Sequence, residues 1–198
     1  NQVVSKIDLH ATTAPTEIFQ RCENAEIILS NKVVLDSETL KKLPHLKLIC
    51  ITATGYNNVD IVAARDLGIA VTNVSGYAQN SVAQYVFAQL LAYYSRIENH
   101  NNNTRNGQWQ TSETFCLHGK GSDELTGKSI GIVGYGALGS KVATIARAFD
   151  MKVLIAERPN ALTIRKDRVA FEQVVAQADI ISLHCPQTED TEGFFNEE

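Results

Sequence analysis

Short apolar runs rich in β-branched residues alternate along the chain with segments in which apolar residues recur at helical spacing. This alternation is typical of βαβ units and of a parallel sheet. It predicts two sets of strands separated by one long helix: residues 25–29, 46–51 and 69–72 in the first set, and residues 129–133, 152–156 and 179–183 in the second. We therefore expect an α/β chain with two Rossmann-like, doubly wound parallel-sheet domains, both incomplete in this chain.

Helical spacing also predicts shorter helices over residues 37–43, 59–67, 138–149 and 171–176. Asp60 is expected to cap the second of these helices and Gly68 to end it. The long helix is expected over residues 81–96 and begins the second domain, so the predicted domains are residues 1–78 and residues 79–198. The asparagine-rich stretch 98–105 shows no apolar period and is predicted to be an exposed loop, and a last helix is expected to start near Phe195.

A glycine-rich turn carries the strongest chemical signal, because it follows a predicted strand and precedes a predicted helix. Gly134 permits a tight turn, Gly136 removes the Cβ that would block a pyrophosphate, and Gly139 lets the helix pack closely on the sheet. Backbone N–H groups of the first helical turn would then face the phosphates, helped by the helix dipole. The turn predicts a dinucleotide site whose members are Gly134, Tyr135, Gly136, Ala137, Leu138 and Gly139.

The next predicted strand ends in Glu157, about 20 residues beyond the turn, where a carboxylate can accept hydrogen bonds from an adenosine ribose diol. A 2′-phosphate would meet like charge there, so NAD is favoured over NADP. The neighbouring Arg158 could present its guanidinium to such a phosphate, and NADP therefore stays an alternative. A nucleoside-binding methyltransferase can also place a glycine-rich turn before an acid, but the full three-glycine spacing argues against that class.

The last predicted strand ends in His184, Cys185 and Pro186. Ligands of doubly wound folds bind at the carboxyl ends of the strands, so Cys185 and Pro186 are expected to line the cofactor site. We interpret His184 as a structural hydrogen-bonding residue, because no partner for a metal or a catalytic pair stands near it in the sequence. The sequence also has no Gly-x-Ser-x-Gly motif, which argues against a hydrolase.

Composition and charge narrow the partners. With 44% hydrophobic and 20% charged residues the chain can bury a core, and its net charge of −4 offers no basic field for nucleic acid or an anionic membrane. The apolar runs are too short to span a bilayer, so we expect a soluble, cytoplasmic protein. The four cysteines are widely spaced, which predicts neither a disulfide framework nor a zinc or other metal site.

Together the turn at 134–139, Glu157, the strand end at 184–186 and the segment 53–60 resemble the D-isomer-specific 2-hydroxyacid dehydrogenases. Within that family, residues 108–110, 115–116 and 131–139 look most similar to the glycerate dehydrogenase (hydroxypyruvate reductase) group. The resemblance implies an NAD-dependent enzyme that transfers hydride between nicotinamide and a small D-2-hydroxy acid or 2-keto acid. It further implies a substrate domain, an NAD-binding domain, a cleft between them and a homodimer. An NAD(H)-sensing module without turnover is the alternative.

The resemblance also implies roles for individual residues. The backbone at Ala53, Thr54 and Gly55 matches the loop that receives the substrate carboxylate, and Val82 matches a position against the nicotinamide. The family's catalytic arginine, acid and histidine match no residue of this chain, and none of its five histidines stands at the matching position. Since keto-acid reduction needs a proton donor, we expect this chain alone to be nearly inert, and the intact polypeptide to begin before Asn1 and to continue beyond Glu198.

Overall fold

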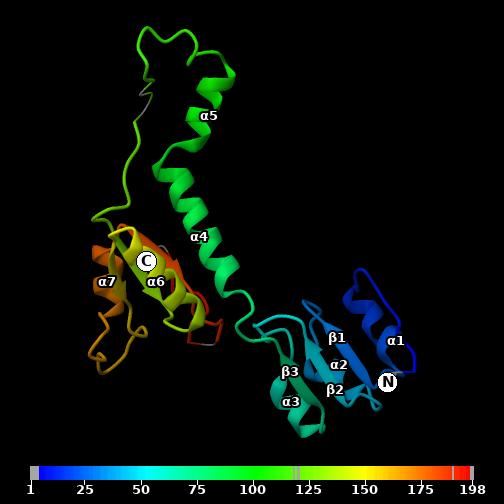
Figure 1. Ribbon diagram of the computed structural model, residues 1–198. Coiled ribbons are helices and arrows are strands. Elements are labelled where there is room, and N and C mark those ends of the chain that lie inside the picture. The colour runs from blue at the N-terminus through cyan, green and yellow to red at the C-terminus, as the bar shows by residue number, and fades with distance from the viewer. Residues whose placement is uncertain (1–4, 118, 120, 189, 197–198) are drawn as a thin grey trace. The chain divides into compact units, whose positions relative to one another are not determined.

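A computed structural model describes residues 5–117, 119, 121–188 and 190–196 (Figure 1). The chain forms two compact units, Asn1–Tyr77 and Ala78–Glu198. Each unit contains a three-stranded parallel sheet. The α/β fold class with two parallel sheets, predicted from the alternating pattern, is thus confirmed. Within the described part of the chain, none of the helices combines the length and apolar character needed to span a bilayer.

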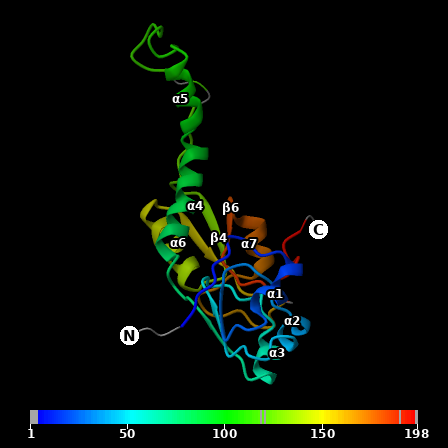
Figure 2. The same cartoon turned by 90° about the vertical axis from the view of Figure 1, so that its right-hand side faces the viewer.

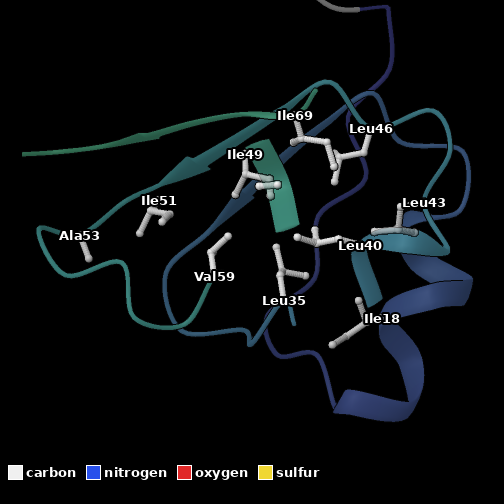
Figure 3. Packing of buried hydrophobic residues seen from close by; sticks show 11 residues of the cluster. Ile18, Leu35, Leu40, Leu43, Leu46, Ile49, Ile51, Ala53, Val59 and Ile69 are labelled. Atoms are coloured by element: carbon white, nitrogen blue, oxygen red, sulfur yellow. The ribbon is translucent and has the colours of Figure 1, made fainter. Parts of the chain in front are cut away.

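The sheet of the first unit consists of β1 (Ile27–Ser30), β2 (Leu48–Ile51) and β3 (Ala70–Asn73). The strands are parallel, and their order in the sheet is their order in the sequence. Helices α2 (Ser37–Lys41) and α3 (Ile61–Asp66) connect the strands. Figure 3 shows the apolar side chains that fill the space between these elements. The largest fully buried side chains among them are Leu35, Leu40, Ile49 and Ile51.

Two predictions about helix ends in this unit are confirmed. An Oδ1 atom of Asp60 accepts a hydrogen bond from the Ala63 N–H at 2.9 Å, which caps α3. Gly68 follows α3 with a φ of +72°, and the chain there turns back toward β3. The apolar pattern did not reveal η1 (Pro15–Glu17) and α1 (Ile18–Cys22), because Ile18 is the one buried residue of these two short helices.

The second unit has the strand order β5-β4-β6, with β4 (Ser129–Val133) between β5 (Lys152–Ile155) and β6 (Ile180–Leu183). Val169 pairs in parallel with Ala156 through an isolated bridge, so one further short extended segment lies beside β5 at the edge of the sheet. Counted with that bridge, the spatial order follows the 3-2-1-4 part of the Rossmann arrangement, in which ligands bind where the order reverses. That reversal lies between β4 and β6.

Helices cover both faces of the central strand β4, whose five residues are all buried. Ile130 and Ile132 pack toward α6 (Ala137–Ala148), while Gly131 faces Val174 of α7 (Phe171–Gln177). Figure 2 shows α6 and α7 on the two sides of β4. The long helix α4 (Gln79–Tyr94) packs against α6, and its Phe87 ring stacks on Phe149 at a centroid distance of 5.4 Å.

Two sequence predictions in this unit are wrong. Residues predicted as an exposed loop form helix α5 (Ile97–Arg105), which starts after Arg96 takes a left-handed conformation with φ 52°. Side chains one turn apart support this helix: the Asn103 amide donates to Asn99 Oδ1 at 3.2 Å. No α5 residue is buried, so there was no apolar stripe to detect. Among the described residues no helix starts near Phe195: residues 191–193 form a turn and residues 195–196 a bend.

Candidate dinucleotide-binding site

The first glycine of the turn lies where β4 and β6 end side by side. Gly134 has a φ of +92°, and an ideal Cβ there would lie 2.4 Å from the backbone nitrogen of Cys185 and 2.6 Å from the carbonyl carbon of His184. Any side chain would collide with main chain, which cannot move aside cheaply. Glycine is therefore required here by the fold, at the point where the strand order reverses.

Gly139 is required by the packing of α6 on β4. An ideal Cβ on it would lie 2.1 Å from the Gly134 carbonyl oxygen and 2.9 Å from a methyl carbon of Ile132. The absence of a side chain lets the first turn of the helix lie directly against the preceding turn. This contact fixes the direction in which the N-terminus of α6 points.

Gly136 differs from Gly134 and Gly139, because no described residue packs against it closely enough to require a glycine. It is exposed, its φ is −90°, and no atom lies within 4 Å of an ideal Cβ. It is also the N-cap of α6, and no side chain caps that end of the helix. Among the described residues, none accepts a hydrogen bond from the N–H groups of Ala137 and Leu138. A bare, uncapped helix N-terminus suits phosphate oxygens.

Arg168 links the turn to the end of β5. Its guanidinium carbon lies 5.3 Å from the centroid of the Tyr135 ring, a cation–π geometry. Its Nη1 donates a hydrogen bond to the Ala156 carbonyl oxygen at 3.1 Å. Sequence reasoning included Tyr135 but missed Arg168. The contact depends on the path of the loop between β5 and α7, which the amino-acid sequence alone does not predict.

Glu157 lies two residues beyond the end of β5, and its side chain is only 4% exposed. Its Oε1 accepts from the Arg158 backbone N–H at 2.9 Å, and its Oε2 accepts from Arg165 Nε at 2.6 Å and from the Arg165 backbone N–H at 3.3 Å. Nη2 of Arg165 donates to Oε1 as well. The Arg165 side chain, followed by the Arg158 N–H, lowers the pKa of Glu157 to about 2. The carboxylate is ionised at neutral pH.

Arg165 was not among the predicted site residues. Arg158, which was, contributes its backbone N–H to Glu157. The signal in the sequence was the cluster of cations at Arg165, Lys166 and Arg168, just upstream of a predicted helix. Only the fold shows which of them returns to the carboxylate.

The end of β6 adjoins the turn through backbone hydrogen bonds. The His184 N–H donates to the Val133 carbonyl oxygen at 2.7 Å. The Nε2 atom of His184 and the Oγ atom of Ser182 are hydrogen-bonded at 2.8 Å. Burial lowers the pKa of His184, which favours the neutral ring. Cys185 is half-buried beside Gly134, and Pro186 is exposed. His118, another of the histidines, lies outside the described residues.

The predicted carboxylate-binding loop lies in the first unit, after β2. The Thr54 hydroxyl donates to the Val74 carbonyl oxygen at 2.9 Å, and the Asn73 amide donates to the Thr54 carbonyl oxygen at 2.8 Å. The Val74 N–H donates to the Ala53 carbonyl oxygen at 3.0 Å. On the side of the loop, these bonds use the carbonyl oxygens of Ala53 and Thr54 and the Thr54 hydroxyl. No described residue accepts a hydrogen bond from the N–H groups of Thr54 and Gly55, and both residues are exposed.

Val82, predicted to lie against the nicotinamide, is in the first turn of α4. Its N–H donates to the Ala78 carbonyl oxygen at 2.9 Å, and its side chain is half-buried. The neighbouring Ala83 is fully buried in the core of the second unit. This burial fixes the rotation of α4 about its axis, and with it the direction in which the Val82 side chain leaves the helix.

Comparison with known proteins identifies the family. A sequence profile described as "D-isomer specific 2-hydroxyacid dehydrogenase, NAD binding domain" matches residues 87–198, which is more than half of the chain. The chain belongs to the D-isomer specific 2-hydroxyacid dehydrogenases. The resemblance stated from the sequence is thereby confirmed.

Relatives of known name are similar to this chain over nearly all of its length. A 2-hydroxyacid dehydrogenase of Haemophilus influenzae is 40% identical over 94% of this chain and 59% of its own length. Glycerate dehydrogenase of Methylorubrum extorquens is 38% identical over 96% of this chain and 60% of its own length. The chain thus spans about three fifths of these relatives.

Two solved structures share the fold. D-lactate dehydrogenase of Aquifex aeolicus, complexed with NAD and lactic acid, has a TM-score of 0.72 at 28% identity, over 86% of this chain and 51% of that one. An acyclic imino acid reductase in complex with NADPH and D-Arg has a TM-score of 0.77 at 28% identity, over 90% of this chain and 57% of that one.

The glycine-rich turn fits the NAD that this domain family binds. Gly134 and Gly139 are required by the packing of β4, β6 and α6. Gly136 has free space where a Cβ would lie, and it stands at the uncapped N-terminus of α6. No described residue lies close enough to position 136 to require a glycine there. NAD is the cofactor of this domain, and the NADPH complex shows that the fold also accommodates the 2′-phosphate form.

Proposed function

We propose that the whole protein is an NAD-dependent oxidoreductase that transfers hydride between nicotinamide and a small D-2-hydroxy acid or 2-keto acid, of the glycerate and hydroxypyruvate type. The observation that carries the proposal is the open position at Gly136, where the fold needs no glycine and a diphosphate does. The relative named glycerate dehydrogenase supports the choice of substrate.

In this proposal the second unit, assigned as residues 79–198, holds the cofactor. Bound NAD would accept or deliver the hydride. The N–H groups at the start of α6 bind the diphosphate, and the anionic Glu157 binds the adenosine ribose. Val82 lies against the nicotinamide. The remaining contacts come from residues around the turn and the two strand ends: Tyr135, Ala137, Leu138, Arg158, Cys185 and Pro186.

The first unit, assigned as residues 1–78, binds the substrate. A 2-keto acid carries a carboxylate, and neutral N–H donors on a fixed loop recognise such a group without a neighbouring cation. The loop at Ala53, Thr54 and Gly55 is held by the bonds to Asn73 and Val74, so its N–H groups are preorganised. We assign proton donation to no residue of this chain.

We also propose a homodimer. Aromatic and apolar side chains on α4, α5 and the segment that follows are strongly exposed, although large apolar side chains are rarely left in water together. They are Tyr85, Tyr93, Ile97, Trp109 and Phe115, with exposed fractions from 50% to 96%. A second copy of the protein is the partner that the family resemblance implies for this surface.

Turnover of NADH tests the proposed activity. Absorbance of NADH should fall when hydroxypyruvate or glyoxylate is added to the full-length protein, and should stay constant without the keto acid. The Gly136→Ala variant is the matched control, because its fold is expected to survive while its cofactor site is blocked. Tight NADH binding without turnover of either acid would support the sensing module instead. Absence of NADH binding would reject both.

A further inference from the structure

The carboxylate proposed to bind the ribose is already covered by a protein side chain. Glu157 accepts hydrogen bonds from the backbone N–H of Arg158, the backbone N–H of Arg165, and both Nε and Nη2 of Arg165. A carboxylate offers about four lone-pair positions, and these four donors use them. A ribose diol that approaches Glu157 therefore competes with Arg165.

The group that faces solvent at this position is the guanidinium. The side chain of Arg165 is 57% exposed, whereas that of Glu157 is 4% exposed. A guanidinium has five N–H groups, of which Glu157 takes two. Its planar fork matches a phosphate well. Because the ion pair neutralises Glu157, a 2′-phosphate meets a cation here rather than an uncompensated anion.

We propose that Arg165 selects the cofactor: it competes with the adenosine ribose for Glu157 and supplies the cation that receives a 2′-phosphate, so the site takes NADP(H) as well as NAD(H). The inference rests on the proposed function of this site. NAD(H) binds through Glu157 only after the guanidinium moves away, while NADP(H) binds to the guanidinium as it stands. Arg165 thus weakens one cofactor and strengthens the other.

The low pKa of Glu157 agrees with this arrangement, since the pair stays ionised throughout the neutral range. Arg168, a second cation of the same loop, is held by Ala156 and Tyr135, so it does not replace Arg165. Within this loop, Arg165 is therefore the cation whose side chain is paired with Glu157 and can exchange that pairing for a phosphate.

Affinities for NADH and NADPH, measured by fluorescence titration of the whole protein, test the proposal. The Arg165→Gln variant should bind NADPH about tenfold more weakly, the loss of one charge-assisted contact, and NADH as well as or better than the parent protein. Lys166→Gln is the matched control, since it removes the same charge one residue away. The ratio of the two dissociation constants should shift in the first variant and not in the second.

Equal shifts in both variants would overturn the proposal, because they would reflect net charge alone. Thermal unfolding shows whether each variant is folded. If Arg165→Gln is not, Arg165→Lys keeps the charge without the fork and should still favour NADH relative to the parent protein. An unchanged ratio in that variant would equally reject the role of Arg165. Failure of the parent protein to bind either cofactor would instead reject the proposed function.

Discussion

Gly134 lies so close to the end of β6 that an ideal Cβ on it would be 2.4 Å from the backbone nitrogen of Cys185. The glycine-rich turn is thus held between two neighbouring strands, and its first glycine serves the fold. Gly136, two residues on, contacts nothing that a side chain would disturb. The same motif therefore combines glycines that the packing requires with one, Gly136, whose proposed role is to make room for the cofactor, and substitutions separate the two kinds.

Gly134→Ala should destabilise the protein by at least about 2 kcal/mol, because the new Cβ meets main chain and the positive φ disfavours a side chain. Urea unfolding measures the loss. Gly136→Ala, in the same turn, should unfold at nearly the parent urea concentration. A Gly134→Ala variant as stable as the parent would show that the turn and β6 are not packed as described.

Replacement of Glu157 should affect the two cofactors unequally. Glu157→Ala removes the acceptor for the ribose hydroxyls and releases Arg165, so NADH binding should weaken about tenfold while NADPH binding should change less. Titration with each cofactor gives the two dissociation constants. Equal losses for NADH and NADPH would contradict the assignment of this carboxylate to the ribose.

Asp179 joins the starts of β4 and β6, and it should make the stability pH-dependent. Its Oδ2 accepts from both the N–H and the hydroxyl of Ser129 at 2.7 Å, and these bonds lower the pKa of Asp179. A lowered pKa in the folded state stabilises the protein above the ordinary pKa of the group, and this contribution is lost as pH falls below about 4. Melting temperatures measured across the acid range should therefore fall less steeply for Asp179→Asn.

The Asn side chain keeps an acceptor oxygen for Ser129 but cannot titrate, which makes it the suitable comparison. Above about pH 5, where the aspartate is ionised, the parent protein should melt at the higher temperature. Parallel pH profiles for the two proteins would show that this carboxylate does not contribute to the acid sensitivity.

The exposed aromatic residues of α4 and the following segment should matter for assembly rather than for folding. Tyr85 is 67% exposed, so Tyr85→Lys should fold normally and shift the mass seen by light scattering toward the monomer. Leu162→Lys is a control on another segment, since Leu162 is fully exposed and lies outside the proposed interface. A monomeric parent protein, or a dimer unaffected by Tyr85→Lys, would reject the interface.

The strands and the glycine-rich turn could be predicted because their signals are local. The β4 sequence is a run of residues buried on both faces, and the spacing of Gly134, Gly136 and Gly139 has a separate physical reason at each position. Gly68 and Asp60 are likewise determined by the backbone within a few residues of them. At these positions the local backbone conformation alone selects the residue type, so the residue type in turn predicts the local structure.

The features that escaped prediction depend on tertiary structure or lack an apolar face. Helix α5 is supported by side-chain pairs such as Asn99 and Asn103 and buries nothing. The partner of Glu157 is eight positions away along a loop without regular structure, and only the return of that loop at Val169 brings Arg165 to the carboxylate. In α4, the large side chains of Tyr85 and Tyr93 are exposed, while the small Ala83 is buried.

Calorimetric titration of NADH into the parent protein and into Gly136→Ala tests the central claim most directly. The account predicts saturable heat with the parent protein and none with the variant, although both melt at nearly the same temperature. No heat with the parent protein, or the same affinity in both, would contradict the assignment of this turn to the cofactor diphosphate.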